Sequence, residues 1–117
     1  MSIRGFFLFV LSIAATFALQ CGNNPLEPEI RGDNEVWIQN GQFVPGTLTV
    51  SKGTTVKWTN KDNVTHTVDS GIPGQPTSDF NLRTLDPGDS DTHRFTEAGA
   101  FDYFCAIHGE TGKIVVQ

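Results

Sequence analysis

Alternating apolar and polar residues run through most of the chain after residue 34, and a period of two is typical of β-strands. In the segment 55–59, Val56 and Trp58 fall on one face and polar residues fall on the other. A later segment places Tyr103 and Cys105 together on one face. On this pattern we expect strands at residues 36–38, 47–50, 55–59, 65–68, 92–96, 101–105 and 113–117.

Turn-forming residues separate these segments. Clusters of Gly, Asn, Asp or Pro fall at 51–53, 60–63 and 86–89, and residues 71–85 are expected to form a long loop. No helical pattern follows residue 33. The chain is therefore expected to be all-β, a Greek-key β-sandwich of about seven to eight strands. The side chains expected to pack in the core, or half-buried against it, are Trp37, Trp58, Tyr103 and His93.

The first 20 residues have the pattern of a targeting segment. Arg4 precedes an uncharged apolar run, residues 5–19, whose length suits a signal peptide better than a membrane span. Residues 17–21 resemble a bacterial lipobox, so we expect lipidation at Cys21; the alternative is an ordinary cleaved signal peptide with Cys21 incidental or removed. The expected organisation is a lipoprotein-type signal peptide at 1–20, a flexible tether at 21–34 and one domain at 35–117.

Length and charge narrow the possible functions. The 117 residues are enough for one small domain, and the net charge of −5 argues against a nucleic-acid partner, which requires a basic surface. The same charge argues against adhesion to anionic lipid through a polybasic patch. Contact with a membrane is therefore expected only through the lipid anchor.

An unpaired cysteine points to metal chemistry. Cys21 and Cys105 are the only two cysteines, so lipidation or removal of Cys21 leaves Cys105 without a disulfide partner in an oxidising compartment. His108 follows three residues after Cys105, and His66 lies at another expected strand end. A thiolate with two imidazoles is a soft, trigonal donor set that favours copper and can hold it in an electron-transfer geometry.

The motifs around these residues resemble those of the cupredoxins, in particular the plastocyanin, pseudoazurin and amicyanin group. The resemblance covers nearly all of the expected domain. It implies that His66, Cys105 and His108 are the equatorial ligands of one copper ion per chain. It also implies that the backbone N–H of Thr67, where the family usually has Asn, donates to the Cys105 sulfur. The segments that carry the resemblance are residues 56–60, 63–68, 85–90, 95–108 and 112–116.

One departure from the family concerns the axial ligand. Cupredoxins usually have a Met shortly after the second His, but Met1 is the only Met of this chain. Three arrangements remain: an axial carboxylate from Glu110, the carbonyl of Thr65 as the only weak axial group, or an empty position. We favour the empty or weak position, because the shortened loop is not expected to aim Glu110 inward.

Three classes of function follow. The first is an electron carrier that exchanges single electrons with a redox protein such as a cytochrome or an oxidoreductase. The second is copper storage or delivery without an electron-transfer role, and the third is a metal-free sandwich used as an interaction module. An enzyme is not expected, because one mononuclear site with three protein ligands leaves no substrate pocket. We expect an exported monomer in the periplasm or cell envelope.

Overall fold

The computed structural model describes residues 28–117, and within that range the chain forms nine strands. The expected signal peptide and Cys21 lie outside the described residues. The described part of the chain holds no helix long and apolar enough to cross a membrane. The strands are β1 Glu35–Gln39, β2 Gln42–Val44, β3 Thr47–Val50, β4 Thr54–Asn60, β5 Asp69–Ile72, β6 Gln75–Asn81, β7 Ser90–Phe95, β8 Gly99–Phe104 and β9 Thr111–Val116.

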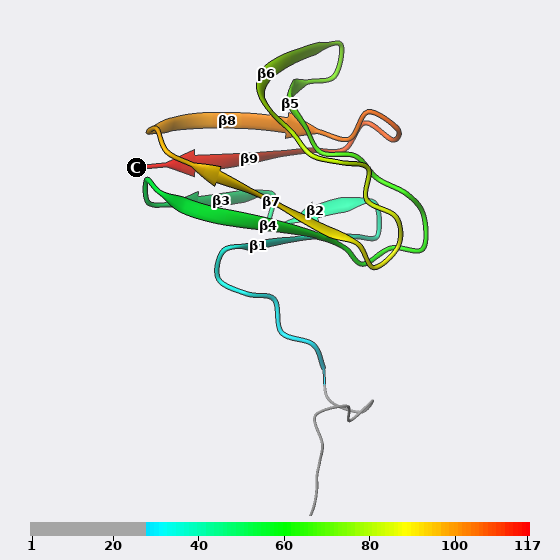
Figure 1. Ribbon diagram of the computed structural model, residues 1–117. Coiled ribbons are helices and arrows are strands. Elements are labelled where there is room, and N and C mark those ends of the chain that lie inside the picture. Colours follow the sequence, from blue (N-terminus) through cyan, green and yellow to red (C-terminus); the bar gives the residue numbers. More distant parts are fainter. Residues whose placement is uncertain (1–27) are drawn as a thin grey trace, which may run out of the picture. The chain divides into compact units, whose positions relative to one another are not determined.

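The strands make two sheets, with the orders β2-β1-β4-β7 and β3-β9-β8-β5-β6. The pairs β1–β4 and β3–β9 are parallel, and the other pairs are antiparallel. Figure 1 shows β8 and β9 in one layer and β1 and β4 in the other. The predicted all-β sandwich is confirmed, with nine strands among the described residues rather than seven to eight.

Two of the expected elements are wrong. Residues 65–68 do not form a strand, because His66 makes only an isolated bridge to Leu85 and the next strand begins at Asp69. Residues 71–85 are not a continuous loop, since they contain the end of β5 and all of β6. Strand β6 buries only Phe80 and pairs only with β5, so its sequence shows no alternation that could predict it.

Aromatic side chains fill the space between the sheets. Trp58 of β4 is fully buried and meets Tyr103 of β8 edge-on, with ring centroids 5.5 Å apart. Phe80 and Phe95 lie 5.8 and 6.3 Å from the Trp58 ring. The alternation of β4 and β8 therefore directs their large side chains into one core, as predicted.

Trp37 is an exception to the expected core. In β1, Val36 and Ile38 are the buried residues, so Trp37 points to the opposite face and is only half-buried. The Nζ atom of Lys61 lies 4.8 Å from the centroid of its ring. Trp37 thus covers the outside of its sheet, and the prediction that it belongs to the core is wrong.

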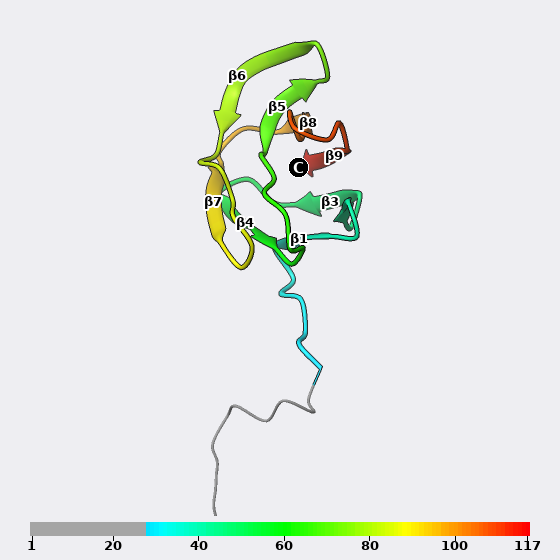
Figure 2. The ribbon, with the colours of Figure 1, turned by 90° about the vertical axis from the view of Figure 1, so that its right-hand side faces the viewer.

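Three connecting segments meet at one end of the sandwich, on the right in Figure 1 and facing the viewer in Figure 2. They are the loop from β4 to β5, the loop from β6 to β7 and the loop from β8 to β9. The candidate metal ligands lie on the first and third of these loops, and the second supports the first. The fold therefore brings together residues that are distant in sequence.

Candidate metal centre

Four side chains converge between the β4–β5 and β8–β9 loops. One donor atom from each of His66, Cys105, His108 and Glu110 lies within 4.8 Å of all the others. The Cys105 Sγ atom is 3.8 Å from the Nδ1 atom of each histidine, and the two Nδ1 atoms are 3.3 Å apart. The three residues expected from the sequence are therefore brought together, with a carboxylate among them.

The position of His66 is fixed by pairing between two loops. Its N–H donates to the carbonyl of Leu85 at 3.0 Å, and the N–H of Leu85 donates back at 2.9 Å. Asn60 is fully buried, and its amide donates to the carbonyls of Val64 and Leu85 at 2.8 and 2.9 Å. These bonds hold the His66 segment without a regular strand.

The β8–β9 loop is a closed turn. The N–H of Cys105 donates to the carbonyl of Glu110 at 2.9 Å, and the N–H of Gly109 donates to the carbonyl of Cys105 at 2.8 Å. Gly109 has a φ of 87°, in the left-handed region that favours glycine. This closure places His108 and Glu110 on the same side as the sulfur.

Thr67 connects the two ligand loops. Its backbone N–H donates to the Cys105 Sγ atom at 3.3 Å, as predicted from the family resemblance. Its hydroxyl accepts the N–H of Ala106 at 2.7 Å and donates to the carboxylate of Asp69 at 2.9 Å. The sulfur therefore accepts a hydrogen bond from the loop that carries His66, and this bond holds it in place.

Glu110 points into the cluster. Its side chain is 8% exposed, and its Oε2 atom lies 2.6 Å from the Nδ1 atom of His66. Apart from that nitrogen, neither carboxylate oxygen has a polar partner among residues 28–117. The loop does aim Glu110 inward, so the reason for expecting an empty axial position is wrong.

The sulfur of Cys105 and the Nδ1 atoms of His66 and His108 fit a single metal ion. Bonds of about 2.0–2.1 Å to nitrogen and 2.3 Å to sulfur, at angles near 105–120°, separate the donors by roughly 3.3–3.8 Å. The separations of 3.3 and 3.8 Å agree with this range. The Glu110 carboxylate lies 2.6 Å from His66 Nδ1, which is closer than this range and requires a proton or a cation beside the two atoms. The soft sulfur and imidazole donors suit copper.

Asp62 was not singled out by the sequence analysis. Its carboxylate lies 2.9 Å from the Nε2 atom of His66 and accepts the N–H groups of Asn40 and Gly41. Burial raises the pKa of Asp62, but the two N–H groups and His66 lower it by more, so the pKa lies below its ordinary value. The signal that could have found it is an acidic residue four positions before a candidate ligand.

The acidic turn at residues 86–91 supports the site structurally. The carboxylate of Asp86 accepts the hydroxyl of Thr65 at 2.8 Å, and the carboxylate of Asp89 accepts the N–H of Asp86 at 3.1 Å. Asp91 accepts the N–H of Arg83 at 3.1 Å. These carboxylates hold the loop that pairs with His66, and they are also part of the acidic surface.

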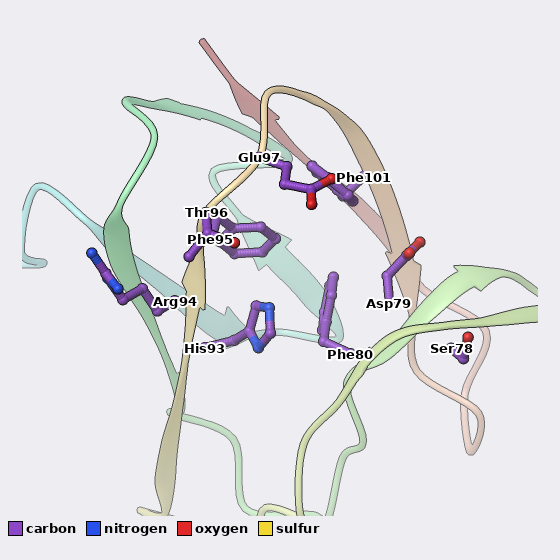
Figure 3. Close-up of a pocket in the computed structure, with 9 residues that line it drawn as sticks. All are labelled: Ser78, Asp79, Phe80, His93, Arg94, Phe95, Thr96, Glu97 and Phe101. Carbon is purple, nitrogen blue, oxygen red and sulfur yellow. The ribbon is translucent and has the colours of Figure 1, made fainter.

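A separate hollow of about 350 Å³ contains His93 but none of the four cluster residues (Figure 3). The imidazole of His93 stacks on Phe80 with ring centroids 5.0 Å apart, and it meets Phe95 edge-on at 4.8 Å. Burial lowers the pKa of His93. The prediction that His93 is a half-buried packing residue is confirmed.

The family model and the related proteins that match this chain all belong to one family. A family model described as the Cupredoxin-like domain matches residues 8–116. Chloroplastic plastocyanin from Tetradesmus obliquus is 31% identical over 113 residues, which cover 88% of this chain and 74% of the plastocyanin. Amicyanin from Paracoccus versutus is 33% identical over 85 residues, which cover 70% of this chain and 63% of the amicyanin.

A solved purple cupredoxin from Nitrosopumilus maritimus has a TM-score of 0.67 and 33% identity, over 73% of this chain and 100% of that chain. The structural match agrees with the sequence matches and with the two-sheet topology. The family model spans most of the chain, and the four converging side chains lie within it. The chain therefore belongs to the cupredoxin family and is a copper-binding electron-transfer protein.

Proposed function

We propose that His66, Cys105 and His108 are the ligands of one copper ion and that Glu110 is the fourth, axial ligand. The observation that carries the proposal is the convergence of one thiol, two imidazole nitrogens and one buried carboxylate within 4.8 Å. Copper bound to such donors supplies reversible one-electron oxidation and reduction. The rest of the proposal concerns what the protein's own residues contribute.

The loops provide a site that changes little between oxidation states. The Cys105–Glu110 turn is closed by backbone hydrogen bonds, and His66 is paired with Leu85 on the opposite loop. Thr67 fixes the sulfur and connects the two ligand loops. Because the donors are held by the sandwich and not by each other, little rearrangement accompanies a change of charge, and this favours fast electron transfer.

His108 provides the route to the surface. It is exposed, whereas His66, Cys105 and the side chain of Glu110 are buried. The neighbouring Ile107 and Val64 are also exposed, at 52% and 47%. We therefore assign electron exchange with a redox protein partner, such as a cytochrome or an oxidoreductase, to the surface around His108.

The axial carboxylate distinguishes this site from one with a Met. A carboxylate is a harder, anionic donor, and its negative charge stabilises Cu(II) more than Cu(I). The proposed coordination therefore predicts a lower reduction potential than an axial Met would give.

The chain is proposed to work outside the cytoplasm, in the periplasm or cell envelope. Residues 1–20 would direct export, Cys21 would carry the lipid, and residues 21–34 would tether the domain to the membrane. A monomer is sufficient, because all four proposed ligands come from one chain.

Titration of residues 22–117 with Cu(II), followed by visible absorption, tests the assignment. A strong thiolate-to-copper band should saturate at one equivalent and should be absent from Cys105→Ser. The matched control is Ser70→Ala, which alters a buried side chain of β5 outside the cluster and should retain the band. A colourless protein, or a band retained by Cys105→Ser, would overturn the ligand assignment.

A further inference from the structure

The carboxylate of Asp62 is a junction between the metal centre and a β-hairpin turn. Asp62 follows β4, and its side chain is 14% exposed. One oxygen, Oδ1, accepts the N–H of Asn40 at 2.6 Å. The other, Oδ2, accepts the N–H of Gly41 at 2.9 Å and lies 2.9 Å from the Nε2 atom of His66. Three separate groups thus converge on a single side chain.

The contact with His66 determines which ring nitrogen can bind metal. A carboxylate is only an acceptor, so Nε2 must carry the hydrogen that joins it to Asp62. In the neutral ring, the other nitrogen then has a free lone pair. That nitrogen is Nδ1, which faces Cys105, His108 and Glu110.

The contact with the turn explains why Asp62 holds its position. Gln39 pairs with Gln42, so Asn40 and Gly41 are the two residues of the turn between β1 and β2. Their φ angles are 56° and 71°, which is typical of a two-residue hairpin turn. The backbone N–H groups of both residues point at the carboxylate. They fix the Asp62 carboxylate, so the imidazole is oriented by a side chain that is itself anchored.

We infer that Asp62 is a positioning residue of the metal centre, which holds His66 with Nδ1 free for the metal and anchors its ring to the β1–β2 turn. The inference rests on the proposed function, in which His66 is a ligand. A negatively charged partner on Nε2 makes the imidazole a stronger donor, which favours the more highly charged metal ion. Asp62 therefore strengthens copper binding and lowers the reduction potential.

The test compares Asp62→Asn with Asp79→Asn in residues 22–117. Both changes remove one carboxylate, but Asp79 accepts the hydroxyl of Thr77 and lies in the separate hollow, which contains none of the proposed ligands (Figure 3). In Asp62→Asn we expect the Cu(II) dissociation constant, measured by chelator competition, to rise roughly 10- to 100-fold. We also expect its reduction potential to rise, while both quantities in Asp79→Asn stay close to those of the parent protein.

A second measurement needs no variant. In the Zn(II)-loaded parent protein, nitrogen-15 NMR should show a His66 ring with hydrogen on Nε2 and metal on Nδ1. The Nε2 hydrogen should exchange slowly with water, because it is bonded to the Asp62 carboxylate and the His66 side chain is only 1% exposed. A His66 ring bound through Nε2, or a rapidly exchanging ring hydrogen, would overturn the inference even if Asp62→Asn does not fold.

The two hypotheses fail in different ways. If the parent protein gives no thiolate-to-copper band, the proposed function fails. If the band is present but Asp62→Asn and Asp79→Asn have the same affinity and potential, the copper site stands and the role of Asp62 is refuted.

Discussion

At the scale of single residues, Glu110 stands in the proposed metal centre where cupredoxins usually have an axial Met. Its carboxylate is buried and lies 2.6 Å from the Nδ1 atom of a proposed ligand, His66. A buried charge with so few partners is costly unless a cation lies beside it. A metal ion beside the Glu110 carboxylate would offset this cost.

Replacement of Glu110 by Gln should raise the reduction potential of the copper protein. Two unit charges 4 Å apart interact by about 4 kcal/mol at an effective dielectric constant of 20, and about 1.4 kcal/mol corresponds to 59 mV for one electron. The rise should thus be roughly 170 mV, measured by redox titration of the visible band. Glu97→Gln removes the same charge from the separate hollow of Figure 3 and is the control. Equal shifts in the two variants would contradict axial ligation.

The sequence predicted the cluster residues only in part. Cys105 and His108 are close in the chain, and His66 could be found because its neighbours match the family pattern. The direction of Glu110 could not be predicted, because it depends on the bond between the Cys105 N–H and the Glu110 carbonyl. The spacing of Asp62, four positions before His66, could have suggested its contact with that ring, but its anchoring could not be predicted, because it depends on the distant turn at Asn40.

At the scale of elements, the hairpin of β5 and β6 shows how the fold goes beyond its hydrophobic pattern. Gly71 has a φ of 110°, and a Cβ atom there would meet the Gln75 carbonyl oxygen at 2.5 Å and Pro76 Cα at 2.8 Å. The hairpin is also held by Ser70, whose hydroxyl donates to the Thr77 carbonyl at 3.1 Å. Strand β6 thus depends on a close backbone approach and on polar contacts, which is why alternation failed to predict it.

Gly71→Ala should destabilise the protein by roughly 2–4 kcal/mol, because a clash with the backbone is added to an unfavourable φ. Gly74→Ala is the matched control, since its φ is 83° but no atom lies within 4 Å of the added Cβ. Gly74→Ala should lower the free energy of unfolding only by the conformational cost of the positive φ, roughly 1–2 kcal/mol. Urea unfolding of both variants measures the difference, and hydrogen exchange should show the loss of protection in β6. Equal unfolding free energies would contradict the role given to the close approach.

At the scale of the whole molecule, the core of the sandwich and the loops at its end have different roles. Its aromatic core gives a rigid body, and the loops at one end hold the proposed ligands and expose His108. The protein carries an excess of acidic residues over this body. Residues 22–117 have 7 Lys and Arg against 13 Asp and Glu, a net charge of −6. Such a charge steers cations toward the surface and repels anions.

The rate of electron exchange should therefore depend on salt in a direction set by the charge of the reagent. The reactant is the reduced copper protein, residues 22–117. Its oxidation by a cationic cobalt(III) complex should become slower as ionic strength rises, and its oxidation by the anion ferricyanide should become faster. The reason is that salt screens both attraction and repulsion beyond a Debye length of about 10 Å at 0.1 M.

Asp86 lies beside the proposed site, so Asp86→Asn should weaken both salt effects more than Glu97→Gln, which removes a charge from the hollow of Figure 3. Stopped-flow absorption of the copper band measures the rates. If the two oxidants respond to salt in the same direction, the acidic surface does not control access to the metal, and exchange is governed by the contact at His108 alone.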